Sequence, residues 1–204
     1  MKYCLVVLSL LLALPLYAAN VMVAPGDPIP GNVEGTVRLL AGQHKTDKTV
    51  EITKSLTLTA EPGAVWISTA NPAIAVHAND VTISNLVLKS ADPTATAIVS
   101  GSPVTLKRPS HRVTIVSNKI EGFVSGVQHV YGDGFVARDN EITGVGAVFD
   151  PLTMQTVGIL STMGSNAVIE GNKMAGFTLG IFLSGSHGRA VKNISRRNSI
   201  GVIF

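Results

Sequence analysis

One eleven-residue pattern recurs along this chain and constrains its fold more than any other feature of the sequence. The pattern reads apolar-x-apolar-x-x-Asn-x-apolar-x-Gly-apolar, and three ungapped copies occupy residues 113–123, 135–145 and 167–177. A degenerate early copy, 81–88, has leucine in place of asparagine, and a late copy starts at Asn198. Self-similar units of this kind are typical of repeat architectures, in which each unit buries its apolar face against its neighbours.

Apolar and polar residues alternate within each unit, which is the periodicity of a β-strand. The alternation breaks at the asparagine, a residue that tolerates the left-handed backbone conformation better than most. We therefore expect two short strands to meet at an asparagine corner in each unit. The corner residues are Asn118, Asn140, Asn172 and Asn198. Their irregular spacing is typical of strand coils joined by loops of different lengths.

A third apolar stretch accompanies each unit. These stretches start at Ala73, Ala97, Gly126, Gly158, Gly180 and Gly201. Three short strands per repeat predict an all-β fold, a right-handed single-stranded parallel β-helix with three short strands per coil. Residues 20–204 are expected to form one such domain of roughly six coils.

The repeat resembles that of the right-handed parallel β-helix proteins of the pectin-lyase-like superfamily, which includes pectin and pectate lyases and polygalacturonases. The resemblance extends from about Thr36 to the end of the chain, and Gly35–Leu40 and Leu56–Ala60 are similar to the first coils of that group. It implies the architecture rather than an activity, because one fold hosts many functions.

The first nineteen residues predict a secretory signal peptide. Lys2 supplies a short positive start, an apolar run extends from Cys4 to Leu14, and Ala18-Ala19 offers a cleavage site. The run is too short to span a bilayer, so we expect a periplasmic or secreted protein with no stable membrane span after cleavage. Cleavage would also remove Cys4, the only cysteine, and with it any disulfide or thiolate chemistry.

The other charges are nearly balanced and include no long run of one sign, so nucleic acid is not an expected partner. The sequence given stops at Phe204, within what would be the first strand of another coil. An end without a polar capping segment predicts either a domain truncated at its C-terminus or an oligomer formed through that uncapped end.

Alternation also predicts which side chains of the third stretch face outward. If Ile74, Ile98, Val127, Ile159, Ile181 and Val202 face inward, the outward row consists of Ala75, Val99, Gln128, Leu160, Phe182 and Ile203. An exposed apolar row often marks a binding surface. The candidate ligand-binding residues on this row and in the adjoining turns are Gln128, Tyr131, Asp133, Leu160, Phe182 and His187. The alternative is that the loop 143–156 folds over the row and buries it.

The resemblance implies that catalytic relatives carry several carboxylates on this row, which bind calcium or act as acid and base. The row has none here, and Asp133 alone cannot form a paired-carboxylate site. The alternative for Asp133 is a purely structural role in a turn. Ser186-His187-Gly188-Arg189 resembles the His-Gly motif of polygalacturonases but lacks the acidic motifs that accompany it. We therefore expect no catalytic residue, although the question of an enzyme stays open.

Two further groups of residues favour structural roles. A basic stretch without the acidic partners found in lyases is expected to be a solvated loop; it contains Lys107, Arg108, His111 and Arg112. His129 and His187 lie two coils apart, too far to share one transition-metal ion, and alternation turns His129 inward with Val127. We expect neither a metal nor a cofactor.

The leading prediction is an exported, non-catalytic β-helix that binds a polysaccharide or a cell-surface protein through the row around Leu160 and Phe182. Two alternatives stay open. One is a polysaccharide lyase or glycoside hydrolase whose catalytic coils are missing or degenerate, and the other is a structural, adhesin-like rod.

Overall fold

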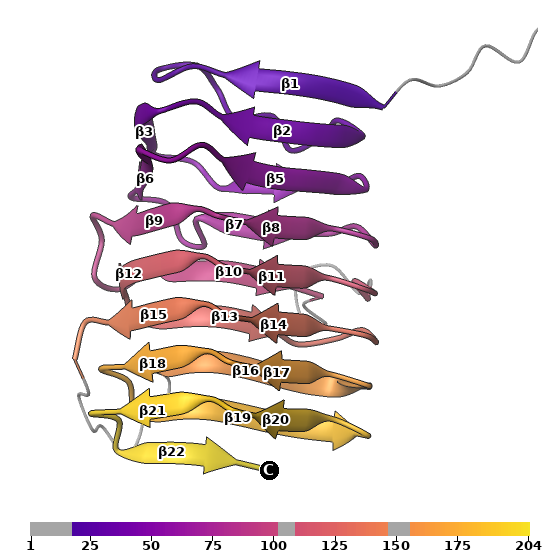
Figure 1. The fold of residues 1–204 in the computed structure, drawn as a ribbon, viewed down its shortest axis with the longest axis vertical. Helices are drawn as coiled ribbons and strands as arrows, with labels where there is room; N and C mark the ends of the chain where they lie inside the picture. Colours follow the sequence, from indigo (N-terminus) through magenta and orange to yellow (C-terminus); the bar gives the residue numbers. More distant parts are fainter. Residues whose placement is uncertain (1–17, 102–108, 147–155) are drawn as a thin grey trace, which may run out of the picture.

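The computed structural model describes residues 18–101, 109–146 and 156–204. All regular structure in these ranges is β-strand, and 22 strands form three parallel sheets of eight, seven and seven strands. We call the eight-stranded sheet A and the seven-stranded sheets B and C. The chain passes through A, B and C in turn, and each circuit, or coil, stacks on the one before (Figure 1). The molecule is a three-faced parallel β-helix, which confirms the fold predicted from the repeat.

Each sheet takes one strand from every coil. Sheet A contains β1 (Ala19–Val23), β2 (Gly35–Leu39), β5 (Leu56–Ala60), β8 (Thr82–Ser84), β11 (Thr114–Val116), β14 (Val136–Arg138), β17 (Val168–Glu170) and β20 (Arg189–Val191). Sheet B contains β3 (Gly42–Thr46), β6 (Ala64–Ser68), β9 (Val87–Ser90), β12 (Lys119–Phe123), β15 (Glu141–Gly144), β18 (Lys173–Ala175) and β21 (Ile194–Arg196). Sheet C contains β4 (Val50–Ile52), β7 (Ile74–Val76), β10 (Thr96–Ser100), β13 (Ser125–His129), β16 (Val157–Ser165), β19 (Leu179–Ser186) and β22 (Ile200–Ile203).

Seven three-strand coils follow β1, whereas the sequence predicted roughly six. The difference arises in the first coil, whose sheet C strand, β4, has only three residues. β7 is equally short but lies in an apolar stretch, whereas β4 carries the charged Glu51 at its centre and does not stand out as one. The six predicted third stretches all form sheet C strands.

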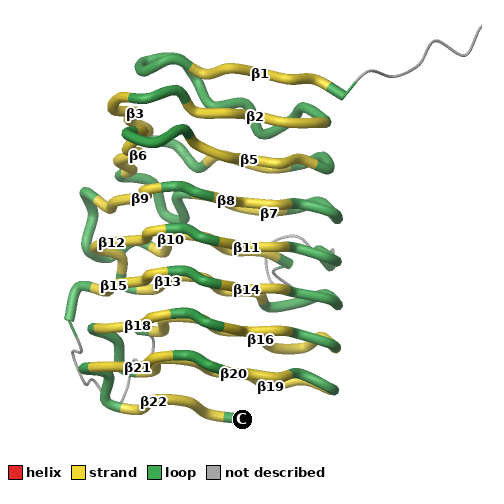
Figure 2. Tube along the Cα trace, viewed as in Figure 1, coloured by secondary structure: helices red, strands yellow, loops and turns green. Residues whose placement is uncertain are grey.

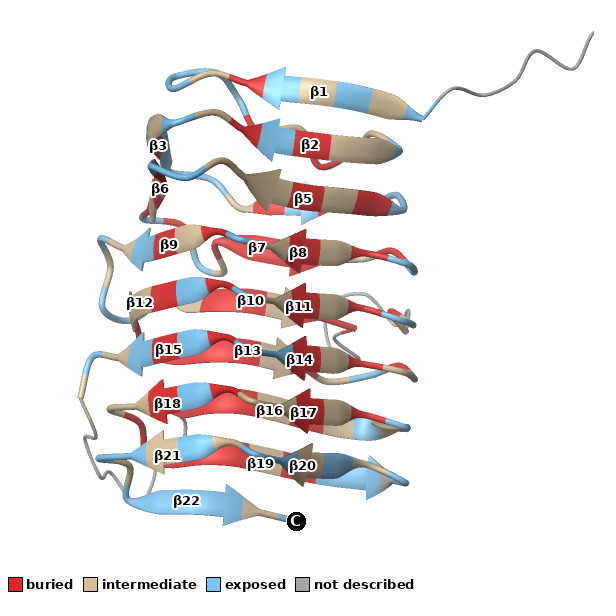
Figure 3. Cartoon of the chain, in the orientation of Figure 1, coloured by how far each residue is buried: buried red, intermediate tan, exposed pale blue. Residues whose placement is uncertain are grey.

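Inward side chains fill the interior of the coils, because alternate residues of each strand face the axis. Ile74, Ile98, Val127, Ile159 and Ile181 are at most 1% exposed, as predicted. The sixth member of this row, Val202, is 40% exposed because its strand pairs on one side only. Buried residues recur at matching positions of successive coils in Figure 3. Each fully buried aliphatic side chain contributes roughly 1.5–3 kcal/mol, so stacking of the coils stabilises the domain.

An asparagine ladder runs through the corner between sheets A and B. The Oδ1 atoms of Asn118, Asn140 and Asn172 accept hydrogen bonds from the backbone N–H of Leu86, Asn118 and Asn140, all at 3.0 Å. Each Nδ2 in turn donates to a backbone carbonyl, for example from Asn118 to Ile83 at 2.9 Å. The three side chains are buried, and the ladder satisfies polar groups that could not reach water.

The left-handed conformation expected at the asparagines belongs to the residue before each of them. Ser117 and Asp139 have φ angles of 55° and 54°, and Gly171 has 68°. The turn is therefore made by an exposed or half-buried residue, while the asparagine that follows points inward and ties adjacent coils together. The expectation failed because it assigned both tasks to one residue.

Asn198 lies at a corner between two strands, as predicted, but at a different corner from the ladder. The fourth position is held by Asn193, whose Oδ1 accepts from the Asn172 backbone N–H at 2.9 Å. Asn198 lies at the next corner of the coil, where its Oδ1 accepts from the N–H of Phe177 at 2.8 Å. The residues after Asn198 match the repeat pattern. The pairing of β20 with β17 and of β21 with β18, however, places Asn193 in the ladder position of the last coil.

The described strands begin at Ala19, and most of the expected signal peptide, 1–17, lies outside the described residues. Within the part of the chain that the structure describes, no helix is long and apolar enough to cross a membrane. Loops and turns occupy the corners between the sheets in Figure 2. Of the candidate functional residues, Tyr131, Asp133 and His187 lie in such turns, whereas the other three lie on strands of sheet C.

Candidate functional site

The six predicted ligand-binding residues lie on three consecutive coils. Gln128, Leu160 and Phe182 are paired in register on β13, β16 and β19. Tyr131 and Asp133 follow β13 in the turn that leads to sheet A, and His187 follows β19 in the corresponding turn. We call this surface the binding face, defined by Gln128, Tyr131, Asp133, Leu160, Phe182 and His187. The face extends from the outside of sheet C onto the corner between sheets C and A.

The outward row on sheet C is less exposed than predicted. The register places Ala75, Val99, Gln128, Leu160, Phe182 and Ile203 in line, as expected. Ala75 is buried, however, and the other five are half-buried. The loop proposed to cover the row, 143–156, lies largely outside the described residues. The row therefore forms the floor of the binding face rather than a freely exposed apolar ladder.

Two exposed side chains stand at the edge of this floor. Tyr131 is 41% exposed and Met163 is 64% exposed. They lie on neighbouring coils. The residues that follow them, Gly132 and Gly164, are so close that a Cβ atom added to Gly164 would collide with the Gly132 carbonyl oxygen. Met163 has a φ of 55° and lies in a bulge of β16, where the pairing with β19 shifts between Ser161 and Gly164. Sequence reasoning missed Met163 because a bulge turns a side chain away from the regular alternation.

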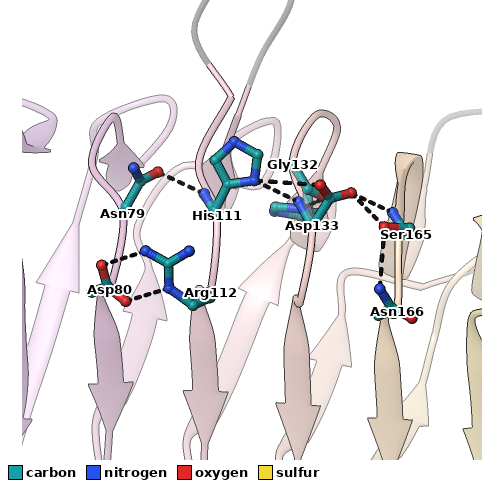
Figure 4. Close-up of polar contacts among 9 residues, drawn as sticks. Asn79, Asp80, His111, Arg112, Gly132, Asp133, Ser165 and Asn166 are labelled. Atoms are coloured by element: carbon teal, nitrogen blue, oxygen red, sulfur yellow. Dashed lines mark hydrogen bonds and ion pairs between the residues drawn. The ribbon is translucent and has the colours of Figure 1, made fainter.

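A polar ladder follows the corner between sheets C and A (Figure 4). The His111 backbone N–H donates to Asn79 Oδ1 at 2.8 Å, and the Asp133 backbone N–H donates to His111 Nδ1 at 3.1 Å. Asp133 Oδ1 accepts from both the N–H and the hydroxyl of Ser165, at 2.8 and 2.7 Å. Each of these side chains thus binds the backbone of an adjacent coil. Asp133 stabilises a turn and is also exposed, so the structural role and the candidate binding role are compatible.

An ion pair lies beside this ladder. Arg112 donates from Nε and from a terminal nitrogen to the two carboxylate oxygens of Asp80, at 2.6 and 2.7 Å. This contact holds the pKa of Asp80 below its usual range, chiefly through the hydrogen bond from Arg112. Arg112 and His111 are therefore tied to neighbouring coils and are not part of a free loop, although Arg112 is exposed to solvent as predicted. Lys107 and Arg108 of the same basic stretch lie outside the described residues.

Both carboxylates of the corner are held in the ionised form. The hydroxyl and backbone N–H of Ser165 lower the pKa of Asp133. Asp80 and Asp133 also lie two coils apart, which corresponds to about 10 Å. Hydrolysis by a carboxylate pair needs one group protonated at working pH, so these two residues do not fit that mechanism. In the described ranges, no three His, Cys, Asp or Glu side chains gather as metal ligands.

His129 supports the binding face from within. As predicted, it faces inward and is fully buried. Nε2 contacts the Gly132 carbonyl at 3.0 Å and Nδ1 contacts the Ser100 hydroxyl at 2.7 Å, so Nε2 carries the proton and Nδ1 accepts. The ring stacks on Phe135 with centroids 4.6 Å apart. Burial lowers the pKa of His129, and the neutral ring anchors the turn that presents Tyr131 and Asp133.

Comparison with models of protein families, with curated proteins and with solved structures finds no significant match for this chain. The class to which it belongs is accordingly defined by its architecture, a three-faced parallel β-helix. Its function has to be argued from the chemistry of its surfaces.

Proposed function

We propose that this chain is an exported, non-catalytic β-helix protein that binds carbohydrate at the binding face. The observation that carries the proposal is the exposure of Tyr131, an aromatic residue two positions before Asp133 in the turn between sheets C and A. A tyrosine offers an apolar ring face together with a hydroxyl, which suits the apolar face and the hydroxyl groups of a sugar ring.

Polar groups around Tyr131 supply both kinds of hydrogen-bonding partner. The ionised carboxylate of Asp133 can accept from sugar hydroxyls in addition to Ser165. His111 accepts the Asp133 N–H at Nδ1, which leaves Nε2 as the ring nitrogen that can donate to a ligand. These groups are held by hydrogen bonds to neighbouring coils, and a rigid set of partners lowers the entropic cost of binding.

The floor of the same face adds apolar contact. Leu160 and Phe182 are in register on adjacent strands, and both are half-buried. Binding without cleavage is favoured because Asp80 and Asp133 both have lowered pKa values and neither can serve as a general acid near neutral pH.

Isothermal titration of the purified protein against a panel of soluble plant and bacterial polysaccharides tests this proposal. We expect Tyr131→Ala to weaken binding roughly tenfold and Tyr131→Phe to retain most of it, since the ring face remains. Met22→Ala removes a comparably exposed side chain from β1 and is the matched control. Equal affinity of wild type and Tyr131→Ala, or the release of shortened oligosaccharides during incubation, would contradict the proposal.

A further inference from the structure

A second surface of the coil is recessed, and it lies on a different side from the binding face. A hollow of about 510 Å3 follows the outside of the corner between sheets A and B. Its lining residues are Ala60, Pro62, Asn85, Leu86, Val87, Ser117, Asn118, Lys119, Asp139 and Glu141. We call this hollow, together with its continuation described below, the corner groove.

Two columns of side chains line the corner groove. One column consists of the residues in left-handed conformation that make the turn, Asn85, Ser117 and Asp139. The other consists of the first residues of β9, β12 and β15, which are Val87, Lys119 and Glu141 and are paired in register. Because the asparagine ladder points its side chains into the core at this corner, the space outside it is left unfilled.

The groove continues over the following coils. A second hollow of about 280 Å3 shares Glu141 and extends past Lys173 to Ile194 and Arg196. Glu141, Lys173 and Ile194 are in register on β15, β18 and β21. From Val87 to Ile194 the groove crosses five coils, or about 19 Å at the usual strand spacing. A groove of this length is suited to several units of an extended polymer rather than to one small molecule.

The groove carries charges of both signs, and they alternate along the column of first strand residues. Asp139 adds a second negative charge beside Glu141, and Arg196 adds a positive charge on the last coil. Lys119, Glu141 and Lys173 follow one another at intervals of one coil. A polymer with one charge per unit would meet repulsion at every second position, whereas a neutral polymer would meet only donors and acceptors. Lys119 is further compensated by Glu121, with Nζ and Oε1 2.8 Å apart.

We propose that the corner groove binds a linear, neutral polysaccharide, independently of the binding face. The amide of Asn85, the hydroxyl of Ser117 and the carboxylates of Asp139 and Glu141 are partners for hydroxyl groups. The proposal extends carbohydrate binding to a second surface and does not depend on Tyr131.

A matched pair of substitutions tests it, with hydroxyethyl cellulose as the neutral probe in affinity electrophoresis. Val87 and Ile67 are both β-branched, half-buried and outward-facing on adjacent strands of sheet B, but only Val87 lines the groove. Val87→Trp is expected to fill the groove and weaken binding roughly fivefold or more, while Ile67→Trp leaves it unchanged. Both variants should fold, because tryptophan is well tolerated on the outer face of a sheet.

A charge substitution gives a gain of binding that a structural role would not produce. Glu141→Lys makes the column uniformly positive and should raise the affinity for polygalacturonate about tenfold at low salt, with the gain lost at high salt. Glu34→Lys changes net charge equally from an exposed site outside the groove and should not do so. Equal effects of these two variants would overturn the proposed groove.

The two proposals fail separately. If Tyr131→Ala abolishes binding of the neutral probe and Val87→Trp has no effect, the corner groove is wrong and the binding face stands. If Val87→Trp abolishes binding of the neutral probe and Tyr131→Ala leaves the affinity for every polysaccharide of the panel unchanged, the binding face is wrong and the groove stands. Absence of neutral-probe binding by the wild-type protein contradicts the groove, and absence of binding to the whole panel contradicts the binding face.

Discussion

Asn118 and Asn140 are 22 residues apart in the sequence, yet Oδ1 of Asn140 accepts hydrogen bonds from both the backbone N–H and Nδ2 of Asn118, at 3.0 Å each. The two side chains are buried and belong to adjacent coils. The amide of Asn140 thus adds a buried side-chain link between two coils that are already paired through their strands.

Asn140→Ala is expected to destabilise the protein by about 2–6 kcal/mol. The substitution leaves the Asn118 N–H and the Ile115 carbonyl without their partner in a buried corner, and each such group costs about 1–3 kcal/mol. Urea unfolding followed by circular dichroism measures the loss. Asn198→Ala, at a half-buried corner outside the ladder, should cost clearly less; similar losses for the two variants would argue against a special role for the ladder.

The free energy of unfolding should depend on pH through His129. Its folded-state pKa is lowered by burial, so the unfolded chain binds the proton more tightly. The stabilising contribution is complete above the unfolded pKa of about 6.5 and is lost as the pH falls from there toward the lowered folded pKa, by up to about 1.4 kcal/mol per pH unit. Unfolding free energies between pH 5 and pH 8 should therefore slope more steeply for wild type than for His129→Gln. Parallel curves for the two proteins would show that His129 is not the titrating group.

A column of glycines on sheet C is expected to be intolerant of any side chain. A Cβ atom at Gly158 would lie 2.6 Å from the Gly180 carbonyl oxygen and 2.8 Å from Cγ of Met174. Gly158→Ala should destabilise the protein by about 1–3 kcal/mol, since backbone and core would have to shift. Gly201 belongs to the same column, but its nearest neighbour would be 3.7 Å away. Gly201→Ala should be nearly neutral. Thermal unfolding of both variants measures the difference, and an equal loss of stability at both positions would refute the steric explanation.

Replacing the turn residue Ser117 by glycine should stabilise the protein. Ser117 has a φ of 55° and is exposed, and a side chain in the left-handed region costs roughly 1 kcal/mol that glycine avoids. Ser84→Gly is the control, because Ser84 lies in the regular strand β8, where glycine should cost about 0.5–1 kcal/mol. The melting temperature should rise for the first variant and fall for the second; a fall in both would mean that the Ser117 side chain itself stabilises the turn.

Much of the fold could be predicted from local pattern. The alternation in residues 113–123 and its copies indicated strands and separated inward from outward side chains, because side-chain direction alternates along any strand. The inward position of His129 and the in-register row through Leu160 and Phe182 follow from the same rule.

Other features depend on how the coils stack. Whether Asn193 or Asn198 joins the ladder is decided by the register of β20 and β21 against the coil before, not by the residues around each asparagine. The position of Tyr131 and Met163 on neighbouring coils and the corner groove also depend on this stacking.

The sequence by itself determined the strands, their faces and the repeating coil, since these rest on interactions between residues close together in the chain. The tertiary structure alone decided which residues of the turns become neighbours, such as Asp133 and Ser165. Loops of unequal length join the strands, so residues that become neighbours are separated by 21, 22 or 32 positions. No fixed sequence spacing therefore predicts which residues become neighbours. Hydrogen bonds between parallel strands set that neighbourhood only once the coils are stacked.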